Sequence, residues 1–221
     1  MSLLSDMKAE NLVPPDRPGA PPATRPYRMV SRSQAAEQTR QAIIQAAFSL
    51  YSERDFDQVS LDDVAARAGV AVRTLLRRFG SKEALLDAVA EAGDREIDDR
   101  RQEVPAGDAA AAVRCVVADY EGYGDAIMRL LSQEDRAAAF GRIAERGRRL
   151  HHAWVERAFA PQLARRSGAT RRRLRAQLIA ITDVYTWKLM RRDLGLGRSA
   201  TIETLREMVA GVIGEPTGGA G

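Results

Sequence analysis

The sequence predicts an all-α protein. Ala, Arg, Leu and Glu dominate its 221 residues and aromatic side chains make up only 5%, a composition that favours helices. Apolar side chains recur at helical spacing along most of the chain from Ile43 onward. The 45% hydrophobic content is ample for a buried core. We therefore expect a small N-terminal three-helix domain followed by a helical bundle.

Residues 1–36 differ in composition from the rest of the chain. Six of the nine prolines lie between Pro14 and Pro26, among Gly, Ala, Asp and Arg and without apolar periodicity. This segment is predicted to be a disordered arm. Its later arginines can lie along a nucleic-acid backbone. A solubilising tail is the alternative, because the acids of the arm nearly balance its bases.

The first helix is predicted over residues 38–54. Its apolar side chains form one stripe: Ile43, Ile44, Ala47, Phe48 and Tyr51. This helix is expected to cross behind the next two and to bury Phe48 against their apolar faces. Three helices would then share one small core.

Two short helices are predicted within the stretch 60–79, SLDDVAARAGVAVRTLLRRF. An apolar set spaced i, i+3, i+4, i+7 begins at Leu61, breaks at Gly69 and restarts in a new phase at Val72. Ser60 is a natural N-cap for the first of them, with acids in the following turn. Two short helices joined by a turn that contains glycine form a helix-turn-helix.

The second short helix carries a one-sided charge. Arg73 and Arg77 lie one turn apart, as do Thr74 and Arg78, so all four share the face opposite the apolar one. From Arg73 to Lys82 there are four cations and no acid. Such a face suits the DNA major groove, where arginine binds phosphates and guanine edges. A solvated surface is the alternative, but turn, periodicity and charge coincide here and predict DNA binding.

Residues 39–87 resemble the N-terminal domain of the TetR family of bacterial transcriptional regulators. The resemblance is carried by Thr39-Arg40 at the start of a helix, by Phe56 and Ser60, by VAARAGV at 64–70, by Thr74-Leu75 and by FGSKEAL at 79–85. With the charge pattern, it assigns DNA contacts to one set of residues: Thr39, Arg40, Ser60, Val72, Arg73, Thr74, Arg77, Arg78 and Lys82. Lys82 is expected to hold a phosphate at the start of a helix.

Four positions depart from the usual residues of the family. Asp55 stands where Gly is usual and is expected to tolerate a positive φ less well. Ala71 stands where Ser is favoured, which removes an N-cap hydroxyl worth about 1 kcal/mol. Leu76 replaces a usual Tyr and Arg78 a common His, so we expect phosphate contact to shift from Leu76 to Arg78.

The domain boundaries follow from these assignments. We expect a DNA-binding domain at 37–80, a connecting helix at 81–93 capped by Ser81, a ligand-binding and dimerisation domain at 94–214, and a flexible tail at 215–221. Beyond residue 108 the apolar pattern predicts five helical segments: 108–132, 135–148, 149–166, 170–193 and 199–213.

A ligand pocket inside the bundle is implied by the resemblance. The candidate lining residues are large aromatic side chains and one methionine: Tyr120, Tyr123, Met128, Phe140, Trp154, Tyr185 and Trp187. Ordinary core packing is the alternative for each. Gly122 and Gly124 each cost about 1 kcal/mol inside a helix, so we expect a kink that opens a cavity there. The effector would be a largely apolar or aromatic small molecule.

The last two helices predict a homodimer. The segment 178–190, LIAITDVYTWKLM, is apolar nearly all round, more than a monomer edge requires. The family packs two such helices against their copies in a four-helix bundle. The expected interface is Leu178, Ile181, Tyr185, Leu189, Ile202, Leu205, Val209 and Val212. Two reading helices at a fixed separation then supply the specificity that one lacks.

Other chemistry is not expected. His151 and His152 point about 100° apart on a helix, so no metal site is predicted. No nucleophile, base and orienting acid stand in a supportive context, so we expect neither an enzyme nor a cofactor. A single cysteine, Cys115, fits a reducing cytoplasm. No apolar run approaches the ~18 residues of a membrane span, and the start MSLLSDMKAENLVPP lacks the features of a secretory signal.

An Arg-rich segment lies between Glu145 and Arg175, with ten arginines against two glutamates. Solvated surface is the expected role, and attraction to an anionic ligand or to DNA is the alternative. The function predicted for the whole chain is a dimeric repressor that a ligand releases from a pseudo-palindromic operator. A regulator without a small ligand, controlled by a partner protein or by its abundance, is the alternative. A small helical enzyme is a weaker one.

Overall fold

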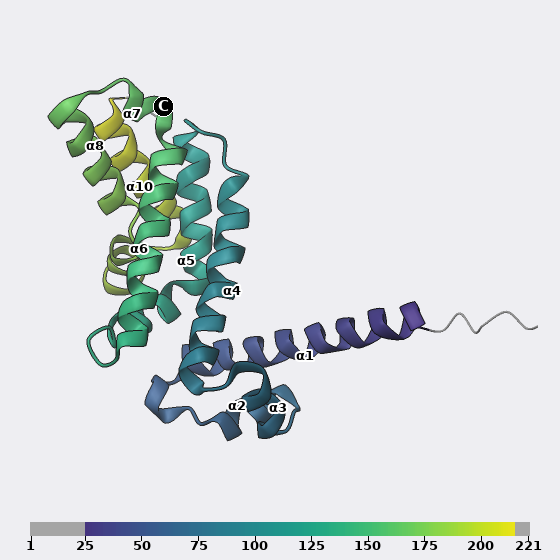
Figure 1. The fold of residues 1–221 in the computed structure, drawn as a ribbon. Coiled ribbons are helices and arrows are strands. Elements are labelled where there is room, and N and C mark those ends of the chain that lie inside the picture. Colours follow the sequence, from purple (N-terminus) through teal and green to yellow (C-terminus); the bar gives the residue numbers. More distant parts are fainter. Residues whose placement is uncertain (1–24, 215–221) are drawn as a thin grey trace, which may run out of the picture. The chain divides into compact units, whose positions relative to one another are not determined.

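The structure is a computed structural model that describes residues 25–214, with side chains from Gln34 onward. All regular elements in this range are helical, so the predicted all-α class is confirmed (Figure 1). In chain order they are α1 (Arg25–Glu53), the short η1 (Phe56–Gln58), α2 (Leu61–Ala68), α3 (Val72–Phe79), α4 (Lys82–Gln102), α5 (Ala109–Leu131), α6 (Ala138–Ala158), α7 (Ala160–Ala164), α8 (Gly168–Ile181), α9 (Val184–Lys188), the π-helical turn η2 (Leu189–Asp193) and α10 (Arg198–Ile213).

Helix α1 begins earlier than predicted. It starts at Arg25, inside the segment expected to be a disordered arm. Pro26 lies in the first turn, where a missing N–H is tolerated, and neither Pro nor Gly interrupts the chain from Tyr27 to Glu53. The rest of the predicted arm, residues 1–24, and the predicted tail at 215–221 lie outside the described residues. Met1–Gln38 and Thr39–Gly221 are separate units, and the hydrophobic cores formed by the described residues belong to the second.

The helix-turn-helix region has its own small core. Ile43 and Leu50 of α1, Val64 of α2, Leu75 of α3 and Leu85 of α4 are almost completely buried in one cluster. Half-buried aromatic side chains pack against this cluster, namely Phe48, Tyr51 and Phe79. The predicted arrangement of α1 behind the two short helices is therefore observed, and α4 completes the core.

A larger core holds the C-terminal bundle together. It collects apolar side chains from α5, α6, α7, α8, α9 and α10, with Trp187 and Phe159 fully buried. The predicted boundary at 148/149 is absent, because α6 runs through it, and the predicted segment 149–166 is instead divided between α6 and α7 at Phe159. The predicted helix 170–193 is instead interrupted after Thr182, where Asp183 accepts a hydrogen bond from the Tyr185 N–H (2.9 Å) and caps α9.

The two glycines of α5 have different surroundings, and neither marks the predicted kink. Helix α5 is continuous from Ala109 to Leu131. Gly122 faces open space, whereas a Cβ added at Gly124 would meet the Trp187 ring, with Cε3 at 2.8 Å. Gly124 therefore lets the indole of Trp187 lie directly against the α5 backbone.

This close packing gives a matched pair of substitutions. Gly124→Ala is expected to lower the free energy of unfolding by about 2 kcal/mol, because the fully buried Trp187 has no room to move away. Gly122→Ala is expected to raise it by about 0.5–1 kcal/mol through helix propensity alone. Urea unfolding measures both, and a Gly124→Ala protein as stable as Gly122→Ala would contradict the packing argument.

Candidate DNA-binding surface and effector cavity

The α2–turn–α3 unit is fixed by local hydrogen bonds. The Ser60 hydroxyl accepts from the Asp63 N–H (3.0 Å), and the Asp63 carboxylate accepts from the Ser60 N–H (2.9 Å), which forms a capping box. These bonds from Ser60 lower the pKa of Asp63. Gly69 ends α2 in the left-handed region with φ 67°. Ser60 is thus confirmed as the N-cap. Its hydroxyl, which is also a candidate for DNA contact, is already hydrogen-bonded within the capping box.

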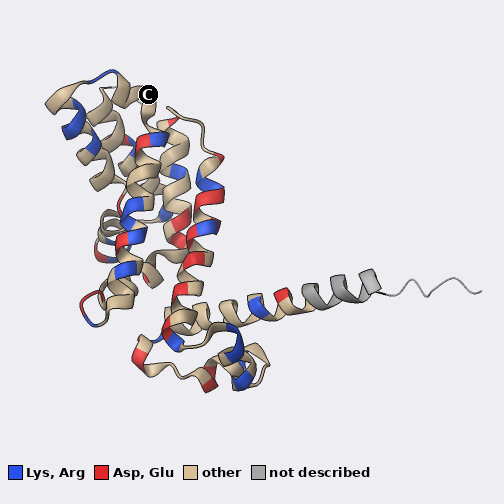
Figure 2. Cartoon of the chain, viewed as in Figure 1, with Lys and Arg blue, Asp and Glu red and all other residues tan. Residues whose placement is uncertain are grey.

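Helix α3 presents arginines that form no ion pair with the described residues. Arg73 and Arg77 are exposed, and no carboxylate among the described residues forms an ion pair with either. The buried Nε of Arg78 also has no hydrogen-bond partner within residues 34–214. By contrast, Arg67 of α2 donates to the Glu53 carboxylate at 2.8 Å. Arg73 and Arg77 are therefore accessible to an external anion, and Figure 2 marks the basic positions of the chain in blue.

The other predicted DNA contacts surround this face. Val72 and Thr74 are half-buried near the start of α3, and Thr39 and Arg40 are half-buried on α1. The Arg40 guanidinium lies 5.9 Å from the centre of the Phe79 ring. These positions adjoin the helix-turn-helix core, and their contacts with DNA remain a prediction.

Lys82 is engaged within the protein. Its ammonium donates to the Phe56 carbonyl (2.5 Å) and lies 4.0 Å from the centre of the Phe56 ring. The accompanying burial lowers the pKa of Lys82. Because the ammonium carries three N–H groups, a phosphate contact remains possible in addition, and it stays a prediction.

Three departures from the family pattern have clear structural outcomes. Asp55 adopts φ −62° and ψ 150°, a conformation open to any residue, so the expected difficulty with a positive φ does not arise. Its carboxylate instead accepts from Arg129 of α5 at 3.1 Å. Ala71 at the N-cap of α3 makes no side-chain cap, as expected, and Leu76 is 41% exposed on the outer face of that helix.

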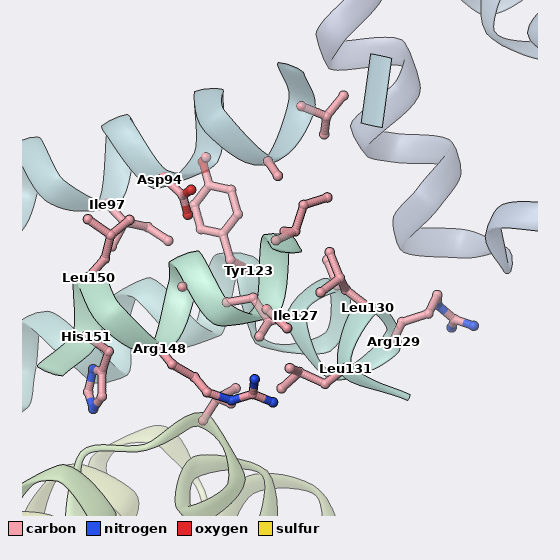
Figure 3. A pocket seen from close by; sticks show the side chains of 18 of the residues that line it. Asp94, Ile97, Tyr123, Ile127, Arg129, Leu130, Leu131, Arg148, Leu150 and His151 are labelled. Carbon is pink, nitrogen blue, oxygen red and sulfur yellow. The ribbon is translucent and has the colours of Figure 1, made fainter. Parts of the chain in front are cut away.

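A cavity of about 230 Å³ is lined by residues of α1, α4, α5, α6 and α9 (Figure 3). Five of the predicted pocket residues line it: Tyr120, Tyr123, Phe140, Trp154 and Tyr185. Met128 and Trp187 do not. Met128 packs against the bundle core, while the Trp187 indole is fully buried and donates to the Glu121 carboxylate at 3.0 Å.

Sequence reasoning missed the side chains that the N-terminal region contributes to this cavity. Phe48 and Tyr51 of α1 and Phe56 of η1 line it, together with His151 of α6. The first two belong to the α1 stripe, whose pattern indicates only a core. The sequence feature that indicates a role beyond the core is the phenol of Tyr51, a polar group within a mainly aliphatic stripe. Its hydroxyl is buried without a partner among the described residues, and burial raises its pKa.

A buried ion-pair network closes one side of the cavity. The fully buried Asp119 carboxylate accepts from Arg101 Nε at 2.7 Å and from Arg100 Nε at 2.9 Å. Arg100 also pairs with Glu96, so two acids balance two bases. The Arg101 guanidinium lies 4.6 Å from the centre of the Trp154 ring. Since Arg101 is itself 5% exposed, its charge depends on Asp119 for compensation.

The hydroxyls of the two central tyrosines are already satisfied. Tyr120 donates to the Thr182 carbonyl (3.1 Å), and burial raises its pKa to about 12. Burial also raises the pKa of Tyr123 to about 12, helped by its hydrogen bond with Glu96. Both residues therefore offer the cavity aromatic faces rather than free polar groups.

The cavity and the helix-turn-helix region share a junction. Besides the Asp55–Arg129 pair, the Phe56 N–H donates to Gln133 Oε1 at 3.3 Å. The Phe56 ring packs edge-on against Phe140, with ring centres 5.2 Å apart. Phe56 thus contacts Gln133, which follows α5, and Phe140 of α6 on one side and Lys82 of α4 on the other.

The predicted dimer residues divide into two groups. Four are buried inside the protomer and have almost no surface to offer a second copy: Leu178, Ile181, Leu205 and Val209. The predicted dimer interface is therefore wrong for these four residues, because their apolar side chains pack inside the same chain. Ile202 and Val212 are half-buried against the same core, whereas Tyr185 (54%) and Leu189 (48%) are exposed.

Two surveys of the described residues bear on other chemistry. No group of three or more His, Cys, Asp and Glu side chains in that part of the chain is arranged to hold a metal ion. Within the same part, none of the helices combines the length and the apolar character of a membrane span. The Arg-rich segment is partly neutralised there, because Glu156 accepts from Arg171 (2.7 Å) and Arg175 (2.6 Å).

Comparisons with known proteins agree with this geometry. The family model described as "Bacterial regulatory proteins, tetR family" matches residues 43–89, which cover the helix-turn-helix. The uncharacterized HTH-type transcriptional regulator YvdT of Bacillus subtilis (strain 168) is 43% identical over 49 residues, 22% of this chain and 25% of that protein. The chain thus matches about a quarter of the length of this curated relative.

Solved structures share the fold over most of the chain. A transcriptional regulator from Rhodococcus sp. Rha1 has a TM-score of 0.64 at 15% identity, over 79% of this chain and 96% of that one. A tetR-family transcriptional regulator from Streptomyces coelicolor has a TM-score of 0.60 at 20% identity, over 78% and 80%. The transcriptional regulator FadR from Bacillus subtilis has a TM-score of 0.59 at 16% identity, over 77% and 98%. Residues 43–89 thus match the DNA-binding domain of the tetR family, and the chain shares its fold with solved transcriptional regulators.

Proposed function

We propose that the protein is a repressor that binds a pseudo-palindromic DNA operator as a dimer and is released by a small ligand. The observation that carries the proposal is the set of basic side chains on α3 that have no acidic partner among the described residues. An arginine that bonds no carboxylate is ready for phosphates or guanine edges. The capping box and Gly69 hold this helix at a defined angle to α2.

The proposed dimer surface is the outer face of α8 and α10, defined here as Ala176, Gln177, Ala180, Met208 and Gly211. All five are exposed in the protomer, and they recur at helical spacing on their two helices. Small side chains allow the helices of a second copy to approach closely. A two-fold contact of this kind places two α3 helices at a fixed separation, which a pseudo-palindromic operator requires.

The junction at Phe56 supplies a route from the cavity to the DNA-binding surface. A ligand that moves the Phe56 or Phe140 ring also moves the carbonyl that holds Lys82 at the start of α4. The ligand therefore favours one arrangement of the two regions over the other. By linkage, DNA and ligand weaken the binding of each other by the same factor. The solved structure of FadR is a complex with stearoyl-CoA, so a protein of this fold accommodates a ligand.

Substitution of Arg73 tests DNA reading. In a fluorescence-anisotropy titration with the duplex from upstream of the gene, Arg73→Ala is expected to lower specific affinity by about tenfold or more. Affinity for a scrambled duplex should change little, because a base contact is lost rather than general charge attraction. The matched control is Arg67→Ala, which removes an exposed arginine that Glu53 already binds. Full sequence preference in Arg73→Ala would exclude Arg73 from base reading.

A further inference from the structure

Two residues that line the cavity carry buried polar atoms that other described residues leave unsatisfied. On α6, His151 Nδ1 and Trp154 Nε1 are buried and have no hydrogen-bond partner among the described residues. Their residues are 8% and 3% exposed, lie one helical turn apart and have ring centres separated by 5.7 Å. Because a buried polar atom without a partner is energetically unfavourable, such a pair beside a cavity indicates a ligand that satisfies both atoms.

The hydrogen-bonding roles of these two atoms can be assigned. The Thr182 hydroxyl donates to the Leu178 carbonyl (2.7 Å), so its oxygen accepts from His151 Nε2 at 3.2 Å. The hydrogen of the imidazole therefore resides on Nε2, and Nδ1 has a free lone pair. Burial lowers the pKa of His151 to about 3, which keeps the ring neutral. The Trp154 indole N–H is a donor only, so the pair consists of one acceptor and one donor.

The charged groups at the cavity do not call for an anionic ligand. Each arginine that lines it pairs with a carboxylate: Arg101 with Asp119, Arg129 with Asp55, and Arg148 with Glu134. Among the lining acids, Asp94 pairs with Arg146 (2.7 Å), Asp98 is exposed to solvent, and Asp183 accepts from the Tyr185 N–H (2.9 Å). Burial of an anion here would leave its charge without a free cation beside it, which is unfavourable.

We infer that this cavity binds an uncharged molecule whose carboxamide or lactam group accepts from Trp154 and donates to His151, with an apolar body among the aromatic side chains. A carbonyl beside an N–H matches the adjacent donor and acceptor. The cavity volume of about 230 Å³ lies below the ~300–1,000 Å³ usual for ligand pockets, so the molecule is small. Only the regulatory role of this ligand rests on the proposed function. Binding of the ligand itself can be measured without DNA.

Four probes of similar size separate the chemical classes. Octanamide has both groups, methyl heptanoate has an acceptor without a donor, octanoate is an anion, and octylamine is a cation at pH 7. In isothermal titration calorimetry with the full chain, octanamide is expected to bind at least about tenfold more tightly than each of the other three. Octanoate or octylamine binding as tightly as octanamide would overturn the inference, as would failure of octanamide to bind.

Matched variants locate the polar group of the probe. Trp154→Phe keeps the aromatic bulk and removes the N–H, so octanamide affinity should fall by about tenfold. Trp187→Phe removes an indole N–H outside the cavity and should leave that affinity unchanged. His151→Phe should lower octanamide affinity but spare methyl heptanoate, which donates nothing to Nδ1. The same loss in Trp187→Phe as in Trp154→Phe would contradict the assignment.

Tyr51→Phe tests whether the polar group of the ligand binds near Tyr51 instead of at Trp154 and His151. The Tyr51 hydroxyl and Arg129 Nε also lack partners within residues 34–214, but both residues are partly exposed. Octanamide affinity should survive Tyr51→Phe, and a loss there without a loss in Trp154→Phe would overturn the inference. Failure of the proposed function alone gives a different result from failure of this inference. In the former case octanamide binds as described while the chain shows no sequence-specific DNA binding.

Discussion

Replacement of Asp119 by alanine is expected to lower the free energy of unfolding by about 3–5 kcal/mol. The carboxylate is fully buried and receives hydrogen bonds from Arg100 and Arg101, and Arg101 is 5% exposed. Removal of the acid leaves the Arg101 guanidinium buried without compensation. Chemical denaturation followed by circular dichroism measures the loss.

Two further proteins show whether charge compensation causes this loss. Glu96→Ala removes the other acid that pairs with Arg100, but this pair is exposed and should contribute less than about 1 kcal/mol. The double replacement Arg101→Met with Asp119→Leu removes both buried charges and should recover most of the stability. An Asp119→Ala protein within about 1 kcal/mol of the parent would show that Arg101 finds compensation elsewhere.

Replacement of Gly211 by arginine is expected to convert the proposed dimer to a monomer. Gly211 lies on the proposed dimer surface of α10, and a Cβ added there meets nothing within 4 Å in the protomer. The protomer therefore accommodates the new side chain, whereas a second copy packed against this face does not. Specific operator affinity should fall about a hundredfold or more, because a single helix-turn-helix reads only a few base pairs.

The matched control for this experiment is Gly122→Arg on α5. Gly122 is also exposed, and a Cβ added there likewise meets nothing within 4 Å. Both proteins gain one charge, so a difference between them reports position. Light scattering coupled to size exclusion gives the mass, and circular dichroism checks the fold. A Gly211→Arg protein that remains dimeric would exclude the α8 and α10 face as the interface.

The DNA-binding region was the part of the structure that the sequence predicted best. Its signals are local: Ser60 and Asp63 are three residues apart, Gly69 forms its turn with its immediate neighbours, and the apolar spacing needs only two turns of helix. The exception was Asp55. Its backbone conformation depends on the whole connection between α1 and α2, and its ion-pair partner Arg129 is distant in the sequence.

The bundle was predicted less well because apolar periodicity shows that a face is covered but not what covers it. Leu178 and Leu205 were assigned to a second copy, yet each is buried by its own chain. The proposed dimer surface of these helices includes small exposed residues such as Ala176 and Gly211, which have no hydrophobic signal. For the same reason, Trp187 was assigned to the pocket although Gly124 admits it to the core.

The cavity required knowledge that no single segment contains. Tyr120 and Trp154 could be proposed from their size and polarity, but the contribution of Phe56 depends on how the helix-turn-helix region meets α6. The unsatisfied nitrogen of His151 could not be foreseen either, because it depends on Thr182, a residue distant in the sequence.

The junction at Asp55 and Phe56 combines two kinds of contact that respond oppositely to dissolved salts. The Asp55–Arg129 ion pair is 37% exposed on both sides, so mobile ions of any kind screen it. The Phe56–Phe140 contact is apolar, and sulfate strengthens apolar contacts because this ion is excluded from protein surfaces. Sodium chloride should therefore weaken the ion pair of this junction. Ammonium sulfate at equal ionic strength should strengthen its aromatic contact. The identity of the ions, as well as their concentration, sets how firmly the two regions are held together.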